Sequence, residues 1–211
     1  QELGPIEDSM ILNSTNLPDD LMVSLSAIGS EGNTLNGDLS GALLSETYRI
    51  TGDINVISGD ELILSEGTEF LFDGPYKFSV EGILKAQGTQ QDSIIFDNYD
   101  NEHWKGFIFE NVTNETILEY VRISGAARGT IYEYEVGGGL YLFNSNPILT
   151  NVVISNNRSD HKGGGIFMYN SDPSLTDVII MDNITGPETG SVRPSSGEIS
   201  SSKGLTVSNP A

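Results

Sequence analysis

The chain has 211 residues and a formal net charge of −20, from 30 acidic and 10 basic side chains. A surface this acidic repels nucleic acid and anionic lipid, so the expected partners are glycans, cations and other proteins. The sequence has no cysteine, which excludes disulfides and thiolate chemistry. No apolar run approaches the roughly 18 residues of a membrane span, so membrane insertion is not expected.

Composition favours an all-β chain. There are 24 glycines and only 8% aromatic residues, and long segments with helical periodicity are missing. Residues 1–46 lie outside the repeats described below, and we expect a cap or an extended arm over the first coil there. Because the chain opens on Gln1, we interpret this end as a mature N-terminus left after removal of a signal peptide.

Residues 47–124 contain short apolar segments at close spacing. INVI, ELIL, EFLF, KFSV, ILKA and SIIF follow one another from Ile54 to Phe96 and predict two coils of short strands. KGFIFE (105–110) and LEYVRIS (118–124) predict a third coil with a longer closing corner.

A duplication follows, at a spacing of 26 residues. GGGLYLFNSNPILTNVVISNN runs from Gly137 to Asn157, and GGGIFMYNSDPSLTDVIIMDN runs from Gly163 to Asn183. A fixed period in this range, with short strands separated by Gly, Asn and Pro, is typical of a solenoid. Each copy predicts three strands, which indicates a parallel β-helix with about three strands per coil and about five to six coils.

Alternation along the strands assigns the side chains to two sides. The residues expected to point inward are Leu140, Leu142, Val152 and Ile154. Tyr141 and Phe143 should point outward, beside Phe167 and Tyr169 of the second copy. Two asparagine ladders are expected, one from Asn144 to Asn170 and one from Asn157 to Asn183.

The last segment, GLTVSNP from Gly204, predicts the first strand of an incomplete final coil, so the β-helix is expected over residues 47–211. An incomplete coil indicates either that the native chain continues or that the coil is completed by end-to-end docking on a second copy, which would give an extracellular filament.

The run from TYRITGDINVISGDELILSEGTEFLF through GILKAQGT, SIIFDN and HWKGFIF to the first copy of the duplication resembles the right-handed parallel β-helix proteins of the pectin-lyase-like superfamily. The resemblance covers about residues 47–185 and is strongest to secreted bacterial surface proteins of that group. It implies a secreted or cell-surface location. It does not imply one activity, because the superfamily includes lyases, hydrolases, adhesins and passive stalks.

The variable corners after the third strand are predicted at residues 97–105, 125–138, 156–164 and 182–204. They should stack along one edge, where insertions of a solenoid carry function. A calcium ion is the candidate cofactor there, because oxygen ligands from stacked acidic loops suit a hard cation. The candidate ligands are Asp97, Asp100, Glu102 and Asp160. The alternative is that an acidic secreted protein carries these acids on its loops without binding a metal.

Four aromatic residues are candidates for binding a glycan or a protein partner. Tyr141, Phe143, Phe167 and Tyr169 should form a two-by-two array that stacks on sugar rings, unless a loop or partner covers it. The only tryptophan, Trp104, falls on the loop edge and is a further candidate.

The function expected from these features is a non-enzymatic structural or adhesive module. The alternative is a polysaccharide lyase or glycoside hydrolase with a groove along the loop edge. The lyases of the superfamily use calcium and a basic residue, and the basic residues near this edge are Arg122, Arg128, Arg158 and Lys162. Arg158 is expected to pair with Asp160 or Asp182 instead. The Gly-His-Gly and Arg-x-Lys motifs of the hydrolases are missing from the sequence.

Overall fold

The computed structural model describes residues 33–100, 102–128 and 137–186 in full, together with four strands outside these ranges. Two of them, β1 (Ile6–Ile11) and β2 (Met22–Ala27), form a separate antiparallel sheet. The other two are β23 (Ile199–Ser201) and β24 (Val207–Ser208). All regular elements of the described residues are strands, so the chain is all-β as predicted.

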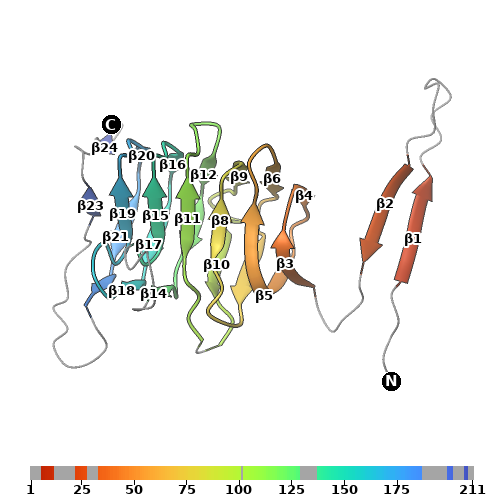
Figure 1. Ribbon diagram of the computed structural model, residues 1–211, viewed down its shortest axis with the longest axis horizontal. Helices are drawn as coiled ribbons and strands as arrows, with labels where there is room; N and C mark the ends of the chain where they lie inside the picture. The colour runs from red at the N-terminus through yellow and green to blue at the C-terminus, as the bar shows by residue number, and fades with distance from the viewer. Residues whose placement is uncertain are drawn as a thin grey trace.

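The remaining strands stack in parallel along the long axis of the molecule (Figure 1). The first row consists of β8 (Phe78–Val80), β11 (Phe107–Glu110), β15 (Leu140–Phe143), β19 (Ile166–Tyr169) and β23. The second row consists of β4 (Gly41–Leu43), β6 (Glu61–Leu64), β9 (Ile83–Gln87), β12 (Ile117–Glu119), β16 (Ile148–Thr150), β20 (Ser174–Thr176) and β24. The third row consists of β7 (Glu69–Phe72), β10 (Ile94–Asn98), β13 (Val121–Ile123), β17 (Val153–Ser155) and β21 (Ile179–Met181).

Two further groups complete the stack. The long strand β5 (Thr47–Val56) belongs to both the third and the first row, because its first half pairs with β7 and its second half with β8. A small sheet of β14 (Ala127–Arg128), β18 (Arg158–Ser159) and β22 (Ile184–Thr185) lies between the third and first rows along the chain. The chain visits the rows in a repeating order, which fits an all-β parallel solenoid.

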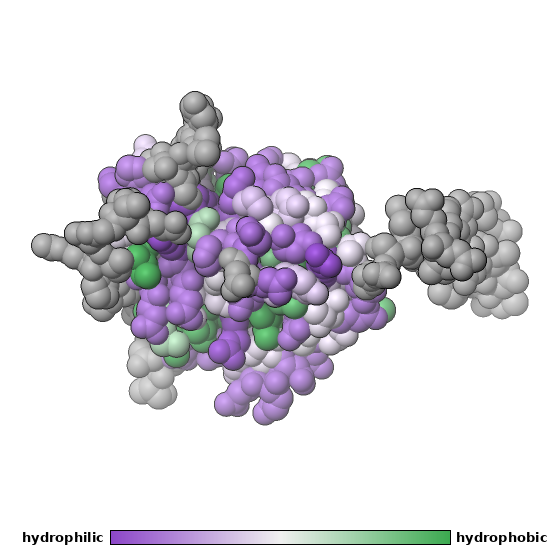
Figure 2. Space-filling model, turned by 90° about the horizontal axis from the view of Figure 1, so that it is seen from below, coloured by the Kyte–Doolittle hydropathy of each residue, from purple (hydrophilic) through white to green (hydrophobic). Residues whose placement is uncertain are grey.

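Alternation along the strands places the core between the rows. Leu140, Leu142, Val152 and Ile154 are completely buried, which confirms their predicted inward orientation. Because the side chains of a strand alternate between its two faces, the intervening residues point to the outer side of the rows. The outer surface is mainly hydrophilic, with small separate hydrophobic areas in the view of Figure 2.

Asparagine residues form the corners after the first-row strands β11, β15 and β19. Asn111, Asn144 and Asn170 have φ values of 57°, 49° and 50°. Asparagine adopts this left-handed conformation at lower cost than most residues other than glycine. The same residue type therefore recurs at the same corner, where the chain turns from the first row to the second.

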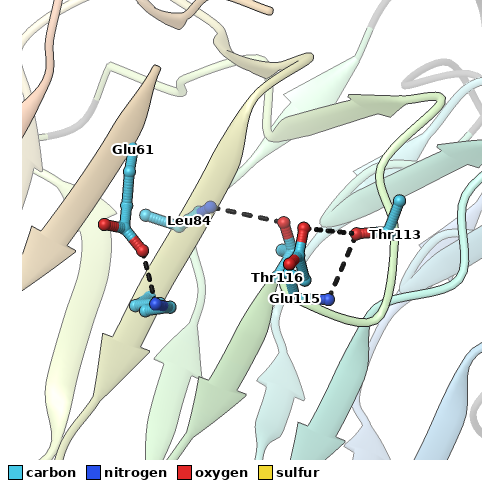
Figure 3. A network of polar contacts seen from close by, with 6 residues as sticks. Glu61, Leu84, Thr113, Glu115 and Thr116 are labelled. Atoms are coloured by element: carbon cyan, nitrogen blue, oxygen red, sulfur yellow. Dashed lines mark hydrogen bonds and ion pairs between the residues drawn. The ribbon is translucent and has the colours of Figure 1, made fainter. Parts of the chain in front are cut away.

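Polar contacts secure the second row and the corner that precedes it (Figure 3). Thr116 is buried, and its hydroxyl accepts a hydrogen bond of 3.3 Å from the backbone N–H of Leu84. At the exposed turn before it, the backbone N–H of Glu115 donates to the Thr113 hydroxyl. Glu61 and Lys85 form an ion pair across neighbouring strands.

The stack begins earlier along the chain than the sequence predicted. β3 (Thr34–Asp38) pairs with β5, and β4 pairs with β6, so both belong to the parallel sheets. The predicted boundary between residues 46 and 47 is therefore too late, because the polar, glycine-containing segment NTLNGDLSGALL lacks the strong apolar alternation of the later strands.

The prediction for the last segment was also wrong. GLTVSNP was expected to be a first-row strand, but Val207 pairs with Leu175 in the second row. The first-row strand is β23, which pairs Ile199 with Ile166 and lies within a segment predicted as a corner insertion. Its sequence, ISS, has one apolar residue and therefore gave no strand signal.

Candidate functional site

Four aromatic rings form an array on the outer side of the first row, which we call the aromatic face: Tyr141, Phe143, Phe167 and Tyr169. The register of β15 and β19 places Tyr141 beside Phe167 and Phe143 beside Tyr169, as the duplication predicted. The ring centroids are 5.8 Å and 5.6 Å apart, with interplanar angles of 11° and 8°.

The rings stack on one another and do not lie flat on the surface. Two parallel rings whose centroids are this close must overlap with an offset, since side-by-side rings in one plane would collide. Within each pair, the two aromatic rings therefore turn their faces toward each other. A ligand reaches mainly the ring edges and those parts of each ring that its neighbour leaves uncovered.

The four rings differ widely in exposure. Tyr141 lies outside the hydrophobic core but retains only 4% of its accessible surface, whereas Tyr169 retains 50%. Phe143 and Phe167 are intermediate. The prediction that Tyr141 presents an exposed ring is therefore wrong, because almost all of the Tyr141 surface is inaccessible to solvent. Tyr169 is the ring that a partner can reach most easily.

An outer amide ladder borders the aromatic face and consists of Asn111, Asn144 and Asn170. Asn170 Nδ2 donates to Asn144 Oδ1 at 2.5 Å, and Asn144 Nδ2 donates to Asn111 Oδ1 at 3.3 Å. This confirms the first predicted ladder and extends it by one repeat. Asn144 and Asn170 directly follow Phe143 and Tyr169, so the outer amide ladder runs along the end of the strands that carry the aromatic face.

Arg128 lies near Tyr141 and is almost completely buried. Its guanidinium donates to the carbonyl oxygen of Lys105, at 3.0 Å from Nε and 2.6 Å from Nη2. Burial lowers the pKa of Arg128 to about 10, against a smaller opposite effect of the Tyr141 phenol. The sequence marked Arg128 only as one of several basic residues near the loop edge. Its burial follows from the three-strand sheet around β14, whose two-residue strands give no periodic signal.

Trp104 was predicted to face a ligand, and this prediction was wrong. Its side chain is completely buried and stacks on Phe72, with ring centroids 4.3 Å apart. Its indole N–H donates to the carbonyl oxygen of Ser124 at 2.7 Å. Trp104 therefore belongs to the core, and the flanking polar residues hid this in the sequence.

The predicted calcium ligands are not brought together. Across residues 33–100, 102–128 and 137–186, no three His, Asp or Glu side chains are placed to hold a metal ion. Asp97 accepts the backbone N–H of Asn98, and Asp160 pairs with Arg158 at 3.5 Å, which confirms that expected ion pair. Asp100 and Glu102 are exposed on the same corner as Asp97. Large parts of two predicted corner insertions, 129–136 and 187–198, lie outside the described residues.

Comparison with known proteins gives a partial likeness. No protein-family model matches the chain, and no solved structure matches it. A segment is 32% identical over 95 residues to Protein bark beetle of Drosophila melanogaster, an alignment that covers 41% of this chain and 3% of that protein. The chain thus spans a small fraction of the relative's length. Where the chain is described, none of its elements is a helix that could cross a membrane.

Proposed function

We propose that this chain is a right-handed parallel β-helix of the pectin-lyase-like kind, secreted or on a cell surface, which acts as a non-enzymatic structural and adhesive module. Three parallel rows and a repeat of 26 residues support the architecture. Such a stack supplies a rigid support for a contact surface.

The aromatic face is the proposed contact surface for a glycan or a protein partner. The single observation that carries this proposal is the Phe143–Tyr169 pair, in which a large ring remains half exposed next to an amide ladder. Partly exposed aromatic rings provide apolar contact, and amides provide directional hydrogen bonds. Carbohydrates and polar protein surfaces both require this combination.

Binding of the full chain to a panel of immobilised neutral and acidic glycans tests the proposal. Tyr169→Ala should weaken binding at least about fivefold, because it removes the most exposed ring of the face. Tyr99→Ala is the matched control, since Tyr99 is 44% exposed but lies against Arg49 in another part of the molecule. Equal effects of the two substitutions would contradict a role for the aromatic face.

The same samples separate adhesion from catalysis. When the chain is incubated with acidic polysaccharides and calcium, we expect no new ultraviolet absorbance from unsaturated products. An increase in absorbance with time that depends on the protein would overturn the non-enzymatic assignment.

A further inference from the structure

Asn36 is the only asparagine in the sequence that precedes a glycine. It lies in β3, where the pairing with β5 shifts between Leu35 and Gly37. Its side chain is exposed, and its amide donates to the Thr51 hydroxyl at 3.2 Å. The site is therefore a surface corner of the stack, and a single hydrogen bond to another side chain holds the amide.

The backbone at Gly37 is sterically unobstructed. Its φ is +82°, and a Cβ placed on it would meet no atom within 4 Å. Glycine moves between backbone conformations more readily than any other residue. The space beside the Gly37 Cα is therefore open to the change of backbone conformation that the reaction requires.

We propose that Asn36 is a site of spontaneous deamidation. The backbone nitrogen of Gly37 loses its proton and forms a bond to Cγ of Asn36, and Nδ2 leaves as ammonia. Water then opens the resulting five-membered imide at one of its two carbonyl groups. Opening at one carbonyl gives aspartate, and opening at the other gives isoaspartate. No oxidant, reductant or enzyme takes part.

Modification at this position changes the end of the stack. Aspartate adds one negative charge to a chain that already carries −20. Isoaspartate adds a carbon to the backbone between the Leu35–Ile50 and Gly37–Ile54 pairs, so β3 can no longer satisfy both. The hydrogen bond of 3.0 Å from Asn55 to Asp38 then loses its alignment.

Four other asparagines are held more firmly. Asn144 and Asn170 precede serine, and both take part in the outer amide ladder. Asn157 and Asn183 are buried. The reaction should therefore concentrate at Asn36.

Incubation of the folded full chain at mildly alkaline pH, followed by peptide mapping, tests the proposal. Aspartate and isoaspartate should accumulate at position 36 before any other asparagine reacts, with release of ammonia. Gly37→Ala should slow the reaction several-fold, and Asn36→Gln should abolish the product at this position. The unfolded chain in urea serves as the reference. An intact Asn36 in the folded chain, or earlier reaction of another asparagine, would overturn the proposal.

Discussion

Asn157 and Asn183 occupy the same position in consecutive repeats, and both amides are buried. The side chain of Asn157 accepts the backbone N–H of Ala126 and donates to the carbonyl oxygen of Ile123, each at 3.0 Å. It also donates to Asn183 Oδ1 at 3.1 Å. This inner amide ladder confirms the second predicted ladder and satisfies backbone groups that the turn after the third row leaves without strand partners.

Asn157→Ala should lower the free energy of unfolding by about 2 to 4 kcal/mol, because two buried backbone groups lose their hydrogen bonds. Urea denaturation, followed by circular dichroism, measures this loss. The matched control is Asn144→Gly, which removes a ladder amide at the surface and still permits a positive φ, and it should cost less than about 1 kcal/mol. Equal losses would show that burial of the inner ladder is unimportant.

Arg128 provides a prediction about pH. Because burial lowers the pKa of Arg128 to about 10, below the ordinary value of an arginine, the folded chain binds fewer protons than the unfolded chain between these two pKa values. This residue therefore makes the free energy of unfolding rise with pH in that window, by about 1 kcal/mol per pH unit.

The difference in unfolding free energy between the wild type and Arg128→Met isolates this contribution, since other titrating groups are common to both proteins. As the pH rises above about 10, the free energy of unfolding of the wild type should increase relative to that of Arg128→Met. The exposed Arg122→Met is the control substitution. A difference that stays constant with pH would contradict the assigned shift.

Among the elements, the glycine triplets at 137–139 and 163–165 allow the small sheet of β14, β18 and β22 to approach the backbone before the first-row strands closely. A Cβ on Gly138 would lie 2.2 Å from the carbonyl oxygen of Arg158 and 2.4 Å from that of Gly164. Gly138→Ala should therefore destabilise the fold by about 3 kcal/mol or more, because backbone atoms cannot move aside easily. Gly41→Asn, at a position with open space, is the control and should cost less than about 1 kcal/mol. Thermal unfolding of both variants measures the difference in stability. Similar melting temperatures of the two variants would contradict the prediction.

Sequence patterns predicted the strands best where alternation was strong. The segments EFLF and SIIF became β7 and β10, and the aligned copies became β15 and β19 in the expected register. Prediction failed for β3, β4 and β23, because their pairing depends on the neighbouring strands more than on their own apolar content. The aromatic face was found from the duplication. Its ring orientation and the burial of Tyr141 depend on packing, which a pattern does not specify.

Over the whole molecule, the core changes from one end to the other. The first half is filled by large rings such as Phe70, Phe96 and Phe107, which are completely buried and contact one another. In the last repeat described, Val178 and Ile180 are only partly buried, and Ile179 on the same strand is 53% exposed. Each repeat of a solenoid is stabilised by its neighbours. We therefore expect β21, at the end of the third row, to be the least stable strand of that row.

Ile154 and Ile180 are a matched pair that tests this gradient, because they occupy the same position in consecutive repeats and their strands pair directly. Ile154→Ala creates a cavity in a completely buried environment and should cost about 3 to 4 kcal/mol. Ile180→Ala removes a side chain that retains contact with solvent, so it should cost less than about half of that. Hydrogen exchange should give the same order, with faster exchange in β21 than in β17. If both substitutions lower the free energy of unfolding equally, β21 is as well covered in solution as β17, and the predicted stability gradient is wrong.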